Sequence, residues 1–211
     1  MTYTKARWIK ALNDRHGAKL QKKISSATVA ICGLGGLGSN IAIALARLGI
    51  GKLILIDFDK VDITNLHRQQ YKVTQIGMYK TEAIRENLME INPYLETEIN
   101  TICINEHNAK ELLCDCDIIC EAFDNPECKA MLVNLVLEEM PDKYIVAASG
   151  MAGMGKSNSI HTRRISRNFY LCGDEISDVS EKIGLVSTRV MLCAAHQAHT
   201  VLRIIAEEYE V

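Results

Sequence analysis

The sequence predicts an α/β protein with a Rossmann-like, doubly wound sheet. The N-terminal half of this sheet is parallel, and antiparallel strands are added in the C-terminal half. Three observations support this. Short apolar runs alternate with segments of helical spacing from residue 28 to residue 148, a glycine-rich turn follows the first run, and two neighbouring strand-like runs replace the alternation after residue 157. The 211 residues contain no linker or repeat, which predicts one domain over residues 1–211.

The first segment of the chain predicts a helical N-terminal arm over residues 1–25. It is polar and basic, and it places Trp8, Ile9, Leu12 and Leu20 at roughly helical spacing. We expect this arm to lie on the domain or on a second subunit.

Residues 28–57 have the length and order of a βαβ unit. An apolar run at 28–32 precedes a helix over 40–48 that Gly49 can end, and a second apolar run ends at Asp57. Because about 30 residues is the usual length of such a unit, its two strands are predicted to be parallel neighbours.

Spacing and helix-breaking residues define the later elements. Asn92-Pro93 ends a helix that starts near Tyr79, and Pro126 opens another helix. Apolar and alternating runs between the helices predict strands. The predicted strands are 28–32, 52–56, 97–103, 117–120, 144–148, 160–165 and 169–172, and the predicted helices after the arm are 40–48, 79–91, 108–113, 126–140 and 187–208.

Charge and cysteine content argue against several classes of protein. With 24 basic and 26 acidic residues the net charge is −2, which gives no long-range attraction to nucleic acid. No run reaches the ~18 apolar residues of a membrane helix, so no membrane partner is expected. The eight cysteines form no Cys-x-x-Cys pair and several lie in apolar runs, which predicts reduced thiols and a cytoplasmic protein.

A glycine-rich loop, Gly33, Gly35, Gly36 and Gly38, joins the first strand to the first helix. Such a loop lets the backbone approach a phosphate and presents helix N–H groups to it, although the glycines could serve only the packing of strand on helix. Asp57 follows Gly38 by 19 residues, where a carboxylate can accept hydrogen bonds from a ribose. The pattern favours nucleotide binding, and an NAD enzyme shares it.

Three charged residues favour a triphosphate over a dinucleotide, because a triphosphate needs cations and a metal. Arg68 and Lys80 are candidate cations, with solvated surface charges as the alternative interpretation. Asp124 follows the fourth strand, where a carboxylate can hold hydrated Mg²⁺. Its alternative role, with Asn125, is to cap the helix that Pro126 opens.

Residues 150–157 match the pattern G-x-x-x-x-G-K-[ST] of a phosphate-binding loop, which stays as an alternative, but we interpret Gly150 to Gly155 as a bend beside a ligand tail. A phosphate-binding loop of this type works only where a helix follows, and the next residues are β-branched or cap-type.

No arrangement of residues typical of a catalytic nucleophile stands out. Cys172 is the best thiol candidate in a loop, with a buried free cysteine as the alternative, and His196 and His199 lack a third metal ligand.

Together these motifs resemble the adenylation core shared by ThiF, MoeB and the ubiquitin-activating enzymes. The resemblance runs from about Arg15 to Ala195 and is greatest to the short ThiF type of thiamine biosynthesis. The residues that carry it are Gly33, Gly35, Gly36, Gly38, Ser39, Asp57, Asp59, Asn65, Arg68, Gln69, Lys80, Asp124 and Asn125.

The resemblance implies a role for each matching position. The glycine loop, Asp59 and Gln69 would border the nucleotide, and Asp57 would bind the ATP ribose. The phosphates would be bound by Asn65, Arg68 and Lys80, and the Mg²⁺ by Asp124. An arginine of the partner subunit's arm, matched here by Arg15, would reach the γ-phosphate. The zinc-binding Cys-x-x-Cys pairs of MoeB and the long ThiF proteins are missing, so no zinc is predicted.

The function implied is that of a homodimeric, Mg²⁺-dependent adenylyltransferase. It would use ATP to convert the Gly-Gly carboxylate of a small ubiquitin-like sulfur carrier, a ThiS-like protein, to its acyl adenylate. Because the attacking carboxylate is already an anion, alignment and charge neutralisation suffice and no general base is required. The alternatives are an NAD-dependent oxidoreductase, a non-enzymatic scaffold, or adenylation of a MoaD-like carrier or an RNA base.

Overall fold

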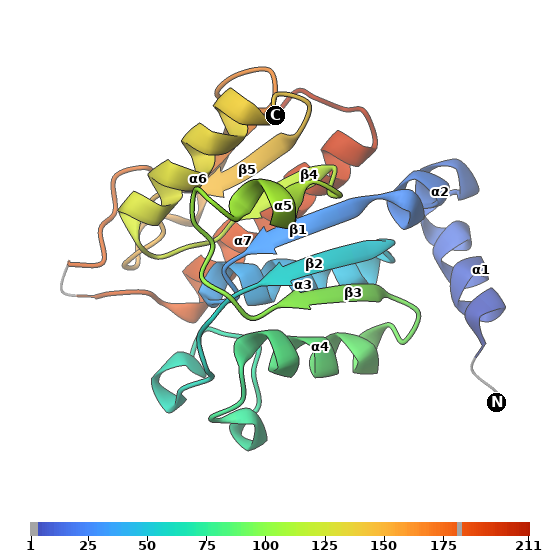
Figure 1. Cartoon of the computed structure of the whole chain (residues 1–211), viewed down its shortest axis with the longest axis horizontal. Helices are drawn as coiled ribbons and strands as arrows, with labels where there is room; N and C mark the ends of the chain where they lie inside the picture. The colour runs from blue at the N-terminus through green and yellow to red at the C-terminus, as the bar shows by residue number, and fades with distance from the viewer. Residues whose placement is uncertain (1–3, 181–182) are drawn as a thin grey trace.

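The computed structural model in Figure 1 describes residues 4–180 and 183–211. Its centre is a seven-stranded sheet in the order β3-β2-β1-β4-β5-β7-β6, in which only β6 runs antiparallel to its neighbour. The strands are β1 (Thr28–Cys32), β2 (Lys52–Ile56), β3 (Glu96–Asn100), β4 (Ile118–Glu121), β5 (Tyr144–Ala148), β6 (His161–Arg164) and β7 (Phe169–Gly173). The predicted Rossmann-like α/β fold is confirmed.

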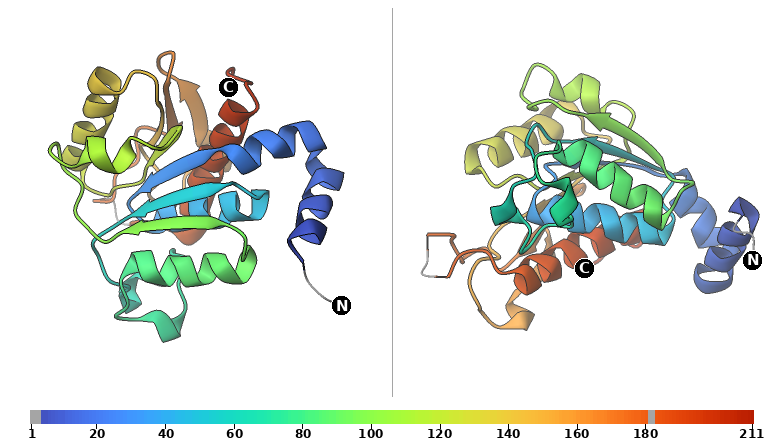
Figure 2. Two further views of the ribbon diagram at one scale, coloured as in Figure 1. Left: turned by 45° about the vertical axis from the view of Figure 1, so that its right-hand side comes forward. Right: turned by 90° about the horizontal axis from the view of Figure 1, so that it is seen from below.

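Helices cover both faces of this sheet (Figure 2). The helices are α1 (Lys5–His16), α2 (Ala18–Ser26), α3 (Gly36–Leu48), α4 (Lys80–Ile91), α5 (Ala109–Leu113), α6 (Pro126–Glu139) and α7 (Ser187–Ile205). One hydrophobic core lies under α3, α4 and α7, and a second, smaller core lies under α5 and α6. The central strands are therefore buried on both faces, as their continuous apolar runs require.

Most predicted elements match the structure to within a few residues. Helix α3 begins at Gly36 rather than residue 40, because the glycine loop forms its first turn and the Ser39 amide donates to the Gly35 carbonyl. The strand predicted to reach residue 103 ends at Asn100. The last helix ends at Ile205 rather than residue 208.

The N-terminal arm consists of two short helices, and its residues 1–3 lie outside the described residues. Helix α2 buries Gln21 and Ile24 against the body, whereas α1 buries no side chain. Helix α1 projects beyond the amino ends of the strands, the end of the sheet opposite the glycine loop (Figure 1). The expected helical arm is thus present, and α1 has a free surface in this single chain.

Within the described residues, no helix combines the length and the hydropathy needed to cross a bilayer.

All eight cysteines are free thiols. Cys172 lies inside β7 and is fully buried, so its placement in a loop was wrong and the alternative of a buried cysteine holds. Burial raises the pKa of this thiol to about 11.

Candidate active site

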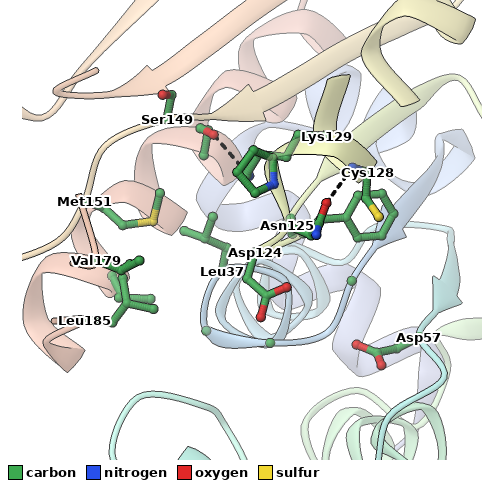
Figure 3. A pocket seen from close by; sticks show the side chains of 18 of the residues that line it. Leu37, Asp57, Asp124, Asn125, Cys128, Lys129, Ser149, Met151, Val179 and Leu185 are labelled. Carbon is green, nitrogen blue, oxygen red and sulfur yellow. Dashed lines mark hydrogen bonds between the residues drawn. The ribbon is translucent and has the colours of Figure 1, made fainter. Parts of the chain in front are cut away.

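A cavity of about 520 Å³ opens at the carboxyl ends of the central strands (Figure 3). The strand order reverses between β1 and β4, and ligands of open α/β sheets bind at such a switch point. The cavity walls come from the glycine loop, from the segments after β2, β3, β4 and β5, and from residues 177–179, Leu185 and Val190. This volume suits a nucleotide-sized ligand.

The glycines of the loop serve two different purposes. A Cβ atom on Gly33 would come within 2.8 Å of the Ala122 carbonyl oxygen, and one on Gly38 within 1.8 Å of the Gly33 oxygen. These two positions are required by packing. A Cβ on Gly35 would have no neighbour closer than 3.8 Å, and Gly33, Gly35 and Gly36 line the cavity whereas Gly38 does not. Close packing of strand on helix therefore explains the glycine at position 38. The glycine at position 35 instead leaves space in the cavity that a side chain would occupy.

Asp57 connects the end of β2 to the glycine loop. One carboxylate oxygen accepts a hydrogen bond of 2.6 Å from the Leu34 amide, and the other accepts one of 2.7 Å from the Asp59 amide. Its side chain borders the cavity (Figure 3), where burial raises the pKa of the carboxyl group. An oxygen with a remaining lone pair can accept a further hydrogen bond from a ligand hydroxyl.

Lys80 lies behind the two acids rather than on the cavity wall. Its Nζ is 2.7 Å from a carboxylate oxygen of Asp59 and 4.0 Å from one of Asp57, and the residue is buried. Asp59 lines the cavity. In this arrangement Lys80 neutralises Asp57 and Asp59, so a phosphate contact for Lys80 stays a prediction.

Arg68 and Gln69 line the cavity and carry polar atoms that have no partner. Arg68 Nη1 donates to the Thr64 carbonyl at 3.3 Å, but Arg68 Nε and Gln69 Oε1 are buried without a hydrogen bond among the described residues. Orphaned buried polar atoms are rare in folded proteins, and both of these belong to residues of the cavity wall. Asn65 ends the short 3₁₀ helix before this segment and does not line the cavity.

Asp124 lines the cavity three residues after the end of β4, and its side chain lies between Met151 and Asp57 in Figure 3. Asn125 caps α6, since its Oδ1 accepts from the Cys128 amide at 2.9 Å. Within residues 4–180 and 183–211, the Asp124 carboxylate takes part in no hydrogen bond or ion pair. The capping role therefore belongs to Asn125, and the Asp124 carboxylate can accept a ligand.

The residues fit Mg²⁺ bound together with a nucleotide rather than by the protein alone. Among the described residues, no group of three His, Cys, Asp or Glu side chains is arranged to hold a metal. Mg²⁺ in nucleotide sites is commonly held by one or two carboxylates plus the substrate phosphates. Asp124 can supply such a carboxylate.

An ion pair between Lys129 and Glu121 at this edge of the sheet was not predicted from the sequence. Lys129 lines the cavity, and its Nζ is 2.9 Å and 3.0 Å from the two carboxylate oxygens of the fully buried Glu121. Burial raises the pKa of Glu121. The sequence did contain a signal for this pair. Glu121 is a charged residue at the end of the apolar run of β4, and a charge buried in a strand needs a partner of opposite sign.

Arg15 lies in α1, at the far end of the sheet from the cavity (Figure 1). It is exposed and does not line the cavity of its own chain. The structure thus brings together Gly33, Gly35, Gly36, Asp57, Asp59, Arg68, Gln69 and Asp124, and leaves Arg15, Gly38, Asn65 and Lys80 off the wall.

The segment 150–157 is not a phosphate-binding loop. The carbonyl oxygens of Ala152, Gly155 and Lys156 accept hydrogen bonds from Arg189, whereas phosphate binding requires N–H groups that face the ligand. Only a three-residue 3₁₀ helix (Ser157–Ser159) follows, before β6. The predicted bend is confirmed, and it lines the cavity at Gly150, Met151 and Ala152.

Residues 9–211 match the ThiF family. The chain belongs to this family. This ThiF-family chain is 31% identical over 152 residues to the adenylyltransferase and sulfurtransferase MOCS3 of Caenorhabditis briggsae, covering 71% of this chain and 37% of that one. It is 38% identical over 150 residues to the ubiquitin-like modifier-activating enzyme 5 of Caenorhabditis elegans, covering 66% and 35%. The ThiF-family chain thus spans little more than a third of the length of these relatives.

Solved structures of E. coli proteins share the fold of the ThiF-family chain. The tRNA N6-threonylcarbamoyladenosine dehydratase TcdA, in complex with ATP, superposes with a TM-score of 0.87 at 19% identity, over 99% of this chain and 98% of that one. MccB with ATP gives a TM-score of 0.71 at 24% identity, over 90% and 59%. At such identities the likeness concerns the fold alone.

Proposed function

We propose that this ThiF-family chain is an adenylyltransferase that transfers AMP from Mg-ATP to the C-terminal Gly-Gly carboxylate of a small ubiquitin-like, ThiS-like sulfur carrier. The proposed setting is thiamine biosynthesis in the cytoplasm. The observation that carries the proposal is that Arg68 and Asp124 face one cavity with the glycine loop. The names of the relatives support adenylyl transfer, and one of them is named for activating ubiquitin-like modifiers.

The proposed chemistry requires no catalytic acid or base. The carrier carboxylate attacks the α-phosphorus, the bond to the bridging oxygen breaks, and pyrophosphate leaves as an anion. No proton is transferred, so the residues need only hold the reactants in line and balance charge. The amides at the start of α3 and Arg68 would face the phosphates, Asp57 the ribose, and Asp124 would hold Mg²⁺, which supplies further charge neutralisation.

The proposed enzyme is a homodimer. Helix α1 buries no side chain in this single chain and carries Arg15. Arg15 of the partner subunit would approach the phosphates from outside, and Lys80 would reach them once the phosphates compete with Asp59 for its ammonium group.

Mass spectrometry of candidate acceptors tests the function directly. The protein is incubated with Mg-ATP and with a ThiS-like carrier, a MoaD-like carrier or tRNA. We expect AMP, attached to the terminal glycine, on the ThiS-like carrier. A mass increase on another acceptor would change the substrate class, and nucleotide binding without any adduct would favour a scaffold.

Cysteine labelling tests the position of the nucleotide. Cys103 and Cys128 line the cavity, whereas Cys114 is exposed elsewhere. At pH 8 we expect Mg-ATP to slow alkylation of the two cavity thiols several-fold and to leave Cys114 unchanged, because a bound ligand covers only its own site. Cys172, with a pKa of about 11, stays unlabelled in either state.

Peptide mapping after a short alkylation pulse gives the rate for each thiol. Equal rates with and without Mg-ATP at Cys103 and Cys128 would contradict the proposed nucleotide site. Protection by NAD in place of Mg-ATP would favour an oxidoreductase.

A further inference from the structure

A buried arginine organises one end of the cavity without lining it. Arg189 lies in the first turn of α7 and is 6% exposed. Its guanidinium donates to the carbonyls of Ala152, Gly155 and Lys156 at 3.0–3.1 Å, donates to Ser159 Oγ at 3.1 Å, and forms an ion pair with Asp174. Since α7 is a rigid helix packed on the core, these bonds attach an irregular segment, 152–159, to a fixed point.

Asp174 attaches the segment after β7 to the same arginine, Arg189. Its other carboxylate oxygen accepts from the amides of Ile176 and Ser177 and from the Ser177 hydroxyl, at 2.9–3.1 Å. The Ser177 hydroxyl in turn accepts from the Ala152 amide at 3.0 Å. The ion pair therefore couples the segment after β5 to the segment after β7.

Both segments form the end of the cavity that lies away from Asp57. Figure 3 shows Met151, Val179 and Leu185 together on one side, Asp57 on the other, and Asp124 between them. The segments also meet directly, because the Gly153 amide donates to the Gly184 carbonyl at 2.9 Å. A Cβ atom on Gly150 would come within 2.2 Å of an Asp174 carboxylate oxygen, so Asp174 also limits the space beside this bend.

We propose that Arg189 and Asp174 are positioning residues that set the width of this end of the cavity for an extended acceptor tail that ends in small residues. The inference rests on the proposed function: if Asp57 binds the ribose at one end of the cavity, the acceptor has to approach the α-phosphorus from the other end, where Met151, Val179 and Leu185 lie. A buried ion pair adds little net stability over apolar packing, but a fully hydrogen-bonded one can specify a single geometry. Arg189 bonds four oxygen acceptors outside Asp174, which the smaller ammonium of lysine cannot reproduce.

The test compares Arg189→Gln with Arg189→Lys in the AMP-transfer assay. The matched control is Arg203→Gln, because Arg203 lies near the other end of α7 and, within residues 4–180 and 183–211, donates its hydrogen bonds to the Glu210 carbonyl. For Arg189→Gln we expect the KM for the carrier to rise about tenfold, with the KM for ATP unchanged within about twofold. For Arg189→Lys we expect an intermediate rise, and for the control none.

A second measurement separates positioning from loss of fold. Carriers ending in Gly-Gly and in Ala-Gly are compared by kcat/KM, and we expect Arg189→Gln to reduce the preference for Gly-Gly. Asp174→Asn, which keeps the size of the side chain, should shift the same ratio if Arg189→Gln fails to fold. An unchanged carrier KM and tail preference, or an equal change in both KM values, would overturn the inference. Absence of AMP transfer by the unaltered protein would instead refute the proposed function.

Discussion

Arg68→Gln and Asp124→Asn will each reduce carrier-dependent ATP–pyrophosphate exchange by about 10²–10³-fold, the usual effect of removing one preorganised charge-stabilising group. Arg68 lines the cavity beside the glycine loop, and the Asp124 carboxylate, also on the cavity wall, has no hydrogen bond or ion pair to any residue that the structure describes. Neither change removes an ion pair of the described structure, so we expect the urea midpoint to stay near that of the unaltered protein. Exchange is measured as incorporation of labelled pyrophosphate into ATP.

Two substitutions away from the cavity serve as controls. Arg47 lies in the last turn of α3, at the other end of the helix that begins with the glycine loop, and Asp115 precedes the amino end of β4. Arg47→Gln and Asp115→Asn make the same changes in charge and should keep normal exchange. Normal exchange in both Arg68→Gln and Asp124→Asn would refute the site assignment.

Gly38→Ala will lower the free energy of unfolding by about 3 kcal/mol, the upper part of the usual range for overpacking a core. The new methyl group would lie 1.8 Å from the Gly33 carbonyl oxygen, a backbone atom that cannot rotate away. Either the first turn of α3 or the end of β1 must therefore shift. Urea unfolding curves measure the change.

Gly35→Ala is the matched control, since its methyl group would have no neighbour closer than 3.8 Å. We expect nearly unchanged stability, but a smaller thermal shift on addition of Mg-ATP, because the methyl group enters the nucleotide space. If Gly38→Ala were as stable as Gly35→Ala, the close packing of strand and helix would not be the reason for the glycine at position 38.

Patterns of hydrophobicity and of turn residues predicted the order of the elements almost completely. The runs of β1, β2 and β5 appear where expected, because a strand buried on both faces must be apolar along its length. The same patterns placed Asp57 and Asp124 after strands. In a parallel sheet all carboxyl ends lie at one edge, so the sequence by itself determined that these acids share a side of the molecule.

Which charged residues pair with one another, when they are distant in the sequence, could be learned only from the tertiary structure. Lys80 pairs with Asp59, Lys129 with Glu121, and the apparent phosphate loop at 150–157 bonds Arg189 through its carbonyls. A lysine has the same local pattern whether it faces a ligand or a buried acid. Only the packing of one element against another decides which acceptor lies within hydrogen-bond distance of its ammonium group.

The burial of Cys172 also depended on the tertiary structure rather than on the local sequence. Its sequence context, at the end of an apolar run before a glycine, is compatible with a loop or a strand. Pairing of β7 with β5 and β6 on its two edges, and α7 over its face, place the thiol in the core. The sequence by itself thus determined the fold and which residues lie at the functional edge of the sheet, because the spacing of apolar residues and the positions of turn residues are local properties of the chain. Only the tertiary structure decided which charges face the cavity and which neutralise one another, because that depends on distances between residues far apart in the chain.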